Sequence, residues 1–513
     1  MLFLHALVLF IIFVCLIYYY FTRNFKYWES RNIRGPRPLP FFGNIKDFVL
    51  RKSNAAVLNK QFYDKYPNEK VVGIFRMTSP TLIIRDLDVA KNVLIKDFEY
   101  FEDRGLELSK EGLGANLFHA DSEIWRPLRT FFSPLFTTAK LKNMIPLIVE
   151  KSDATINHFK KITELQKDQD VYSLVQKFTM SSILTCAFGL DIAVDSEILL
   201  QRMMKIDQLS FSRTIANDCD LLYPGVLKII NASVFPKEVS KFFLDLVEDI
   251  IQARNGIPSD RKDFIDLILE AKNQGTILET KKNDDVGSTV KCVKLTNEVI
   301  AAQAFIFYTA GYETNATTMA YMMYELAMNP QIQEKLIAEV DQVVHRHNGK
   351  ITYEMINELS YMEKVLNETL RKYPVIDVQR RAKANYNIPG TNIVIAKGTI
   401  IIVPTLGISQ DEKYYPNPTK FDPERFSPEN DSKRHPCAFI PFGVGPRYCI
   451  GMMFARIQSR VFLMKLLSNF RVETSKNTQS TIVFNPGRVV TAPKDGIYLN
   501  LIPRKSQYDT KNK

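Results

Sequence analysis

The sequence predicts a mainly helical protein with minor β structure, in which one large domain follows a single N-terminal transmembrane helix. The first 21 residues are apolar or aromatic except for His5. A second apolar stretch, from Leu295 to Met328, has no proline and only one glycine, which favours a long buried helix. The length would suggest about three domains. No Gly/Ser linker, low-complexity tract or internal repeat divides the chain, however, so we expect one.

The N-terminal segment, residues 1–21, is long enough to cross a bilayer once, at about 1.5 Å per residue and a core of about 30 Å. A cleaved signal peptide is the alternative, but it would need a basic start and a small-residue cleavage site, which are missing. Tyr18, Tyr19 and Tyr20 are typical of an interfacial aromatic belt. Basic residues follow, with Glu29 the only acid among them: Arg23, Lys26, Arg31, Arg34 and Arg37. The positive-inside rule therefore predicts an uncleaved anchor with the rest of the chain in the cytosol.

Short β segments are expected at three places. Val71 to Arg85 contains the strand-like runs VVGIF and TLIIR, and Asn387 to Val403 forms a second candidate region. Thr481 to Leu501 predicts a C-terminal hairpin. The polar stretch from Asn273 to Lys294 predicts a surface loop between two helices.

The chemically most specific stretch runs from Phe442 to Gly451 and reads F-G-V-G-P-R-Y-C-I-G. It places Cys449 between a glycine-broken loop and a segment whose apolar spacing suits a helix. Free backbone N–H groups and the positive end of the helix dipole favour a thiolate at such a position. Gly445 and Gly451 allow close backbone approach, and Arg447 adds a fixed positive charge. This setting favours metal binding.

A lone cysteine in an apolar chain is more often a small buried hydrophobe, and this reading suits the other five. They form no C-x-x-C pair, and the spacing from Cys437 to Cys449 is not a zinc pattern. His435 and Cys437 could both be ligands, but no residues supply the remaining two. The five are Cys15, Cys186, Cys219, Cys292 and Cys437.

The pattern F-x-x-G-x-R-x-C-x-G resembles the haem-ligand signature of the cytochrome P-450 monooxygenases. Four further elements of that family occur upstream of it: Trp125-x-x-x-Arg129, Ala310-Gly-Tyr-Glu-Thr314, Glu368-x-x-Arg371 and Phe421-Asp-Pro-Glu-Arg-Phe426. They follow in the family's order from residue 125 to residue 451, so the resemblance covers nearly the whole chain. It implies the cytochrome P-450 fold, mainly α with minor β.

The resemblance implies haem b as the cofactor, with the Cys449 thiolate as its axial iron ligand. N–H groups around Gly451 would moderate the thiolate, and Phe442 would either shield the sulfur or simply pack in the core. The residues expected to bind the haem propionates are Trp125, Arg129, Arg380 and Arg447. Arg381 could take the propionate role in place of Arg380, because the segment after Tyr373-Pro374 is one residue shorter than the family usually has.

The Ala310–Thr314 segment is the second site that the resemblance implies. Ala310 and Gly311 would leave room for dioxygen, while Thr314 and Glu313 would relay protons to it. Asn315 departs from the family, which often has Ser or Thr there; the departure leaves the acid–alcohol pair intact. Glu368, Arg371 and Arg425 are expected to form a buried structural triad.

Four units are expected along the chain. Residues 1–21 form the transmembrane anchor, and residues 22–44 form a basic linker that ends in the proline hinge Gly35–Gly43. Residues 45–505 form the monooxygenase domain, and residues 506–513 form a polar tail.

The sequences of Ala302–Phe307 and Tyr324–Pro330 are similar to those of insect microsomal members of the detoxification type. The resemblance implies insertion of one oxygen atom from O2 into lipophilic small molecules at the endoplasmic reticulum membrane. NADPH–cytochrome reductase would supply electrons, with cytochrome b5 as a second candidate partner. The substrate pocket is expected in Leu106–Phe118, Leu209–Thr214, Phe305–Ala310, Val375–Val378 and Arg488–Thr491, with Tyr223–Phe235 dipping into the bilayer.

The net charge of +11 does not indicate nucleic-acid binding, because no zinc finger, RNA-recognition signature or basic helix with interleaved aromatics is present. It favours a surface that faces an anionic membrane or an acidic redox partner. The residues expected to dock that partner are Lys433, Arg434, Arg456 and Arg460. Two other functions remain open: a haem-thiolate isomerase or dehydratase, and a haem carrier without turnover.

Overall fold

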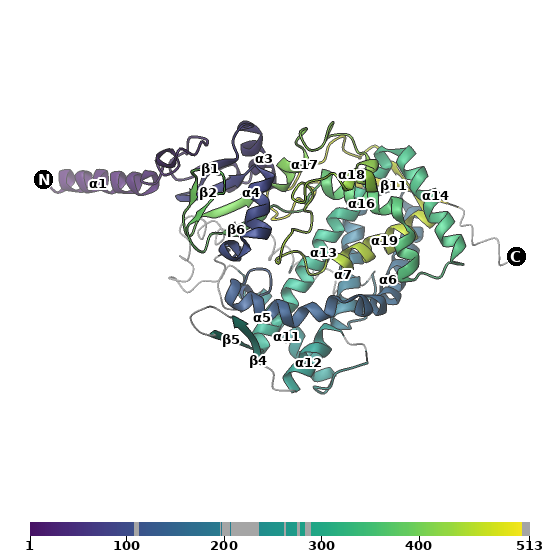
Figure 1. Ribbon diagram of the computed structural model, residues 1–513. Helices are drawn as coiled ribbons and strands as arrows, with labels where there is room; N and C mark the ends of the chain where they lie inside the picture. The colour runs from purple at the N-terminus through teal and green to yellow at the C-terminus, as the bar shows by residue number, and fades with distance from the viewer. Residues whose placement is uncertain are drawn as a thin grey trace.

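The computed structural model describes residues 1–106, 112–194, 196, 206, 235–260, 263–273, 277–282 and 289–504. In these ranges long helices form the bulk of the molecule and short strands lie mainly toward the N-terminal side (Figure 1). This confirms the predicted class, mainly α with minor β. The helices are α1 (Leu2–Thr22), α2 (Lys46–Val49), α3 (Ala55–Lys65), α4 (Leu87–Lys91), α5 (Ser122–Phe132), α6 (Thr138–Leu165), α7 (Val171–Phe188), α11 (Lys237–Ala253), α12 (Phe264–Asn273), α13 (Asn297–Met328), α14 (Pro330–Arg346), α15 (Tyr353–Glu358), α16 (Ser360–Lys372), α17 (Thr405–Ser409), α18 (Pro428–Asp431) and α19 (Met452–Asn469).

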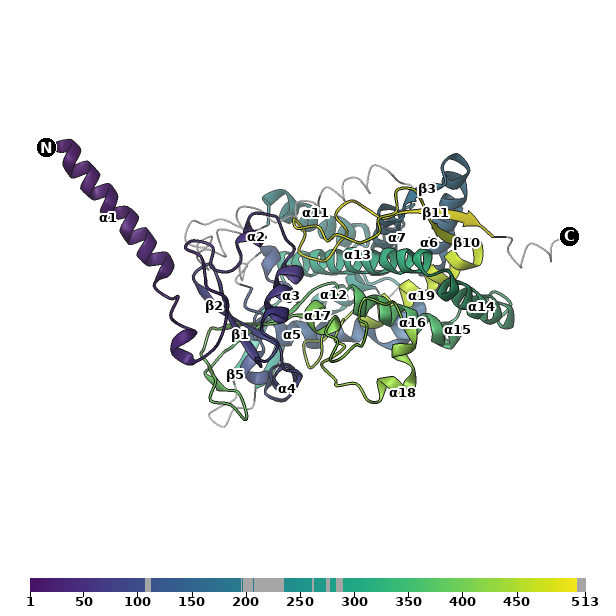
Figure 2. The same ribbon diagram turned by 90° about the horizontal axis from the view of Figure 1, so that it is seen from above.

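The first helix, α1, projects away from the rest of the molecule (Figures 1 and 2). Its mean hydropathy is 2.7, and none of its residues is buried. By length and composition it can cross a membrane, and it is the one helix among the described residues that meets this description. Such an exposed apolar helix needs an apolar environment, so its isolation agrees with the predicted anchor.

The long helix α13 lies at the centre of the helical part and packs against α7, α11, α16 and α19 (Figure 2). Side chains on all its faces are buried, as expected for a segment with no polar stripe. It begins where the Thr296 hydroxyl accepts a hydrogen bond from the Val299 N–H at 3.3 Å. The predicted buried helix is therefore confirmed, and it runs without interruption through Ala310–Thr314.

The largest sheet has four strands in the order β1-β2-β9-β6. The pairings are antiparallel except for β2 with β9, so the predicted strands near Val71–Arg85 and Asn387–Val403 are confirmed. The strands are β1 (Val71–Arg76), β2 (Ser79–Ile84), β3 (Asp168–Asp170), β4 (Ile277–Lys282), β5 (Thr289–Lys294), β6 (Val378–Arg381), β7 (Tyr386–Asn387), β8 (Val394–Ile395), β9 (Ile400–Val403), β10 (Phe470–Thr474) and β11 (Tyr498–Pro503).

Two predictions for surface segments are wrong. The loop expected from Asn273 to Lys294 contains an antiparallel hairpin, β4 and β5, whose strands include the β-branched residues Ile277, Thr280, Thr289, Val290 and Val293. The hairpin expected within Thr481–Leu501 is reduced to one isolated bridge, Phe484 with Pro493. Prolines in this stretch lack the N–H that a longer ladder needs. The last strand, β11, pairs instead with β10 and β3.

Candidate active site

The Cys449 loop is a tight turn held by its own backbone. The Cys449 N–H donates to the Phe442 carbonyl at 2.8 Å, and Gly443 and Gly445 have φ of 71° and 73°. A Cβ on Gly445 would lie 1.9 Å from the Leu94 carbonyl oxygen, so glycine is required for both its dihedral and its space. The helix α19 begins at Met452, as the sequence predicts. The sulfur is thereby fixed just before a helix N-terminus.

Cys449 faces an internal space. Its residue surface is exposed, yet burial is the largest influence on its thiol and raises the pKa. The N–H of Gly451 and the charges of Arg129 and Arg104 lower the pKa without outweighing burial. The protein alone therefore favours the thiol, and a metal cation on the sulfur would favour the thiolate.

The other described cysteines lie in different surroundings. Cys186 and Cys437 are buried among apolar side chains, and burial raises the pKa of Cys437 to about 11. Cys15 lies exposed on α1, so the prediction of a buried hydrophobe is wrong for it. Cys219 and the side chain of Cys292 lie outside the described residues. Within the described part of the chain, no cluster of three His, Cys, Asp or Glu side chains could hold a metal on its own.

The middle of α13 also faces an internal space. Ala310 is exposed and Thr314 is half-buried, although most of this central helix is buried. The Thr314 hydroxyl donates to the Ala310 carbonyl at 2.7 Å. Gly311 faces another way, because a Cβ there would lie 2.9 Å from the Ile183 side chain of α7. Its missing side chain thus serves helix packing, and Ala310 carries the open surface.

Asn315 connects α13 to the helix that follows the Cys449 loop. Its amide donates to the Gln458 side chain at 2.5 Å and its oxygen accepts from the Ser459 hydroxyl at 2.7 Å. All three residues are buried. The departure from Ser or Thr at this position therefore adds a side-chain link between α13 and α19.

Glu313 is fully buried and its carboxylate has three donors. Tyr172 and Gln176 of α7 donate to it at 2.7 and 2.8 Å, and Arg488 forms an ion pair at 2.8 Å. Burial and the adjacent carboxylate raise the pKa of Tyr172 well above its usual value, so this phenol stays a donor. None of these partners could be predicted from the sequence, because they lie more than a hundred residues from Glu313.

Three arginines lie close together, and the charges of Asp103 and Asp121 offset only part of the cost of burying Arg447. Arg380 and Arg447 are 1% and 3% exposed, while Arg104 keeps accessible surface even though burial lowers its pKa to about 10. Burial and the nearby Arg104 charge lower the pKa of Arg447 to about 8, and they also lower the pKa of Arg380 well below its usual value. Buried guanidinium nitrogens of all three lack hydrogen-bond partners: Nε of Arg104, Nε of Arg380, and Nε and Nη1 of Arg447.

Such a cluster favours an anionic ligand, because buried guanidinium nitrogens without partners are costly. Arg104 and Cys449 lie close enough for the sulfur to influence the pKa of Arg104. The cluster therefore fits a ligand that carries carboxylates and sits beside Cys449. Arg104 was not predicted, and no motif in the sequence around it would have revealed it.

The remaining residues expected at the propionates lie around this cluster. The Arg447 guanidinium stacks 4.2 Å from the Trp125 ring centre, and Arg129 donates to the Tyr448 carbonyl at 3.0 Å. Both Trp125 and Arg129 lie on α5, as the sequence pattern requires. Arg381 differs, because it forms ion pairs with Asp103 and Asp121 at 3.4 and 3.0 Å.

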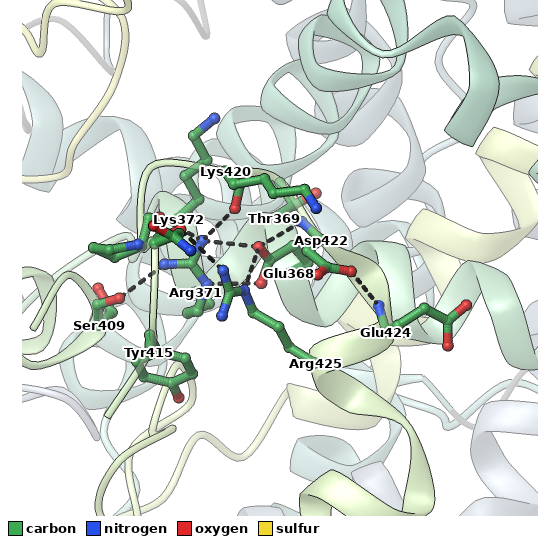
Figure 3. Close-up of polar contacts among 12 residues, drawn as sticks. Glu368, Thr369, Arg371, Lys372, Ser409, Tyr415, Lys420, Asp422, Glu424 and Arg425 are labelled. Carbon is green, nitrogen blue, oxygen red and sulfur yellow. Dashed lines mark hydrogen bonds and ion pairs between the residues drawn. The ribbon is translucent and has the colours of Figure 1, made fainter. Parts of the chain in front are cut away.

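The predicted triad of Glu368, Arg371 and Arg425 is brought together (Figure 3). Arg371 donates through Nε and Nη2 to both oxygens of Glu368, at 2.7 and 2.8 Å. Arg425 lies 3.5 Å from the same carboxylate, which also accepts the Asp422 N–H at 2.9 Å. Arg371 further donates to the carbonyls of Ser409 and Pro418, so three chain segments meet here.

The residues expected to dock a redox partner are mostly engaged with the protein itself. Lys433 is well exposed, with 72% of its side chain accessible. Arg434, Arg456 and Arg460 are 7–15% exposed and lie beside Asp431 or Glu363. Of these four side chains, that of Lys433 alone has most of its surface accessible to a partner protein.

Parts of the expected substrate pocket lie outside the described residues, namely residues 107–111 and 209–214. Of Tyr223–Phe235, only Phe235 is described. Phe305–Ala310 lies on α13, and Val375 accepts the Thr491 N–H at 3.0 Å. The segments Val375–Val378 and Arg488–Thr491 are therefore neighbours, as a shared pocket requires.

Comparisons with known proteins agree with this geometry. The family model "Cytochrome P450" matches residues 33–500. The chain is 53% identical to Cytochrome P450 6B1 of Papilio polyxenes over 98% of this chain and 100% of that protein. It is 50% identical to Cytochrome P450 6B2 of Helicoverpa armigera, over 95% and 96% of the two chains, and 34% identical to Cytochrome P450 6j1 of Blattella germanica, over 95% of each. The chain belongs to the cytochrome P450 family and is a haem-thiolate monooxygenase, an oxidoreductase that works with redox partners on lipophilic substrates.

Proposed function

We propose that Cys449 holds the haem iron and that the chain inserts one oxygen atom from O2 into lipophilic small molecules. The observation that carries this proposal is the cluster of arginines with unpartnered guanidinium nitrogens beside the exposed Cys449. When bound, the haem supplies the iron that activates dioxygen, and the thiolate donates electron density that favours O–O cleavage. The protein supplies the ligand, the counter-charges and the proton donors.

Arg104, Arg380 and Arg447 fit the two haem propionates. Guanidinium groups donate hydrogen bonds to carboxylates in a fixed geometry, and the unpaired nitrogens of this cluster are available for them. Trp125 stacks on Arg447 and Arg129 adds positive charge on the same side. Arg380 rather than Arg381 takes the propionate role in this proposal, because Arg381 already has two acidic partners.

An Arg380→Gln variant is expected to release haem about 10-fold faster than the unmodified protein, because one charge-assisted hydrogen bond is lost. Arg381→Gln, the matched control, is expected to change the rate less than about 2-fold. Haem transfer to a scavenging apoprotein, followed by absorbance, measures both rates. A larger effect at Arg381 would contradict the assignment.

We assign proton delivery to Thr314 and Glu313 on α13. The Thr314 hydroxyl borders the internal space, where it can hold a water molecule or donate to a bound ligand. Glu313 is an ionisable group on the next residue, and Ala310 leaves space beside them. Gly451 donates to the Cys449 sulfur and moderates the ligand, while Phe442 packs at the base of the same loop.

Replacing Thr314 with Ala is expected to divert NADPH electrons into free peroxide and to lower product formed per NADPH about 10-fold, since general acid catalysis contributes about 100-fold or more. Thr318→Ala is the matched control, because its hydroxyl makes the same type of bond one turn later, to the Thr314 carbonyl. Peroxide yield per NADPH measures the effect. Unchanged coupling in the Thr314 variant would exclude the role.

The proposed electron donor is NADPH–cytochrome reductase, with cytochrome b5 as a second donor, and the proposed location is the endoplasmic reticulum membrane. The isolated apolar helix α1 and the basic segment after it support a single-pass anchor with the catalytic domain on the cytosolic side. Reconstitution with reductase, NADPH and vesicles tests this directly. Oxygen consumption matched by an oxygenated product supports the proposal; turnover without reductase or O2 would indicate an isomerase, and no turnover would indicate a carrier.

The proposed substrates are lipophilic xenobiotics. Support comes from the amino-acid sequence of α13 and from the relatives in the cytochrome P450 6B group. Spectral shifts of the purified protein with a panel of lipophiles would identify the class of compound that it binds.

A further inference from the structure

The segment from Asn485 to Thr491 is fastened to distant parts of the chain. The Asn54 side-chain nitrogen lies 3.1 to 3.3 Å from the carbonyl oxygens of Asn485, Arg488 and Val490, so its two hydrogens are shared among three acceptors. At the other end, the Tyr321 hydroxyl of α13 donates to the Thr491 carbonyl. Asn54 is 2% exposed, and its oxygen caps α3 through the Ala56 N–H at 3.0 Å. The buried Asn54 amide therefore holds the first part of this segment on its path, and Tyr321 holds its end.

That path directs the Arg488 side chain onto α13. Its Nη2 lies 2.8 Å from the Glu313 carboxylate, with only 12% of the Arg488 side chain and none of the Glu313 side chain exposed. The yellow segment before β11 runs over α13 in Figure 2, which agrees with this contact. Breaking a buried ion pair leaves a costly uncompensated charge. The position of the segment therefore affects the position and charge environment of the Glu313 carboxylate.

The arrangement also limits what else Glu313 can bind. Adjacent helix residues do not face each other, and Glu313 points to α7 while Thr314 borders the internal space. A carboxylate offers about four acceptor positions. Among the described residues, Arg488, Tyr172 and Gln176 together supply three donors, which leaves about one acceptor position for a further donor.

We propose that Arg488 is the positioning residue for Glu313. Asn54 acts through it: by holding the Asn485–Thr491 segment in place, Asn54 keeps Arg488 on Glu313 and so affects proton delivery. The inference rests on the proposed role of Glu313 in proton delivery. Because the segment borders Val375 and carries the exposed Val489, a substrate that displaces it also displaces Arg488. Substrate shape would thereby change how many NADPH electrons reach product.

A double-mutant cycle on the haem-loaded protein tests the positioning role. Arg488→Gln is expected to lower product per NADPH about fivefold, and Arg488→Lys less, because lysine keeps the charge. In a Glu313→Gln background, Arg488→Gln should change coupling less than about twofold. An equal loss in both backgrounds would overturn the positioning role and indicate structural damage. If Glu313→Gln alone leaves coupling unchanged, the proposed role of Glu313 in proton delivery fails, and this inference fails with it.

Hydrogen exchange tests the Asn54 step without any turnover. Asn54→Ser keeps a side-chain cap for α3 but removes the amide donors, so the Gly487 and Thr491 amides should exchange about 10-fold faster. Coupling should fall in the same variant. Arg471→Gln is the matched control, because it removes only an exposed ion pair with Glu334. Unchanged exchange in Asn54→Ser, or faster exchange with full coupling, would overturn the link.

Discussion

A Cys449→His variant is expected to lose the thiolate-type Soret band of the reduced carbon-monoxide complex and all monooxygenase turnover. The band depends on electron donation from an anionic sulfur, and a neutral imidazole does not supply it. The loop that holds Cys449 is fixed by the Phe442 carbonyl and by Gly445 against Leu94, so no other described cysteine can take its place. We expect complete loss of the band and of turnover, because both depend on the single Cys449 sulfur.

The control for this experiment is Cys437→Ala. Cys437 is fully buried in an apolar cluster and precedes the same loop, but burial raises the pKa of its thiol to about 11. This variant should keep the band at full intensity per haem. A thiolate-type band that survives in Cys449→His, measured by reduced-minus-oxidised difference spectra in carbon monoxide, would refute the ligand assignment.

The parts of the site that the sequence predicts well are those encoded over a few residues. The turn before α19 needs glycines at fixed offsets, and Glu368 and Arg371 meet because residues three apart share a helix face. The long apolar run that forms α13 has the same local character. Each of these features could be read from spacing alone.

The parts that escape prediction depend on tertiary contacts. Arg104 joins the arginine cluster only because the chain folds it beside Arg380 and Arg447. Arg488 was expected to line a pocket, and the structure pairs it with Glu313, 175 residues away. The β4–β5 hairpin was missed because charged residues are interspersed with its β-branched residues and no regular alternation marks the strands. No spacing rule encodes such contacts between remote segments.

Replacing Arg371 with Ala is expected to reduce the free energy of unfolding by about 3–5 kcal/mol and to leave little haem-loaded protein. Glu368 and Arg371 are fully buried, and burial raises the pKa of Glu368 even though two arginines oppose the shift. Removing Arg371 would leave the carboxylate with only the longer contact to Arg425 and the Asp422 N–H, and would take the donor away from the carbonyls of Ser409 and Pro418. Denaturant unfolding and haem content per protein measure the loss.

The position of each charge predicts an order of effects. Arg425→Ala should cost less than Arg371→Ala, because its contact with Glu368 is longer, at 3.5 Å, and 13% of its side chain is exposed. Glu424→Gln, the surface control, removes ion pairs with Lys335 and Lys364 and should cost less than about 1 kcal/mol. Equal losses at Arg371 and Glu424 would show that burial does not govern this network. The triad would then contribute no more than an exposed pair, and the segments bearing Ser409, Pro418 and Asp422 would need another anchor.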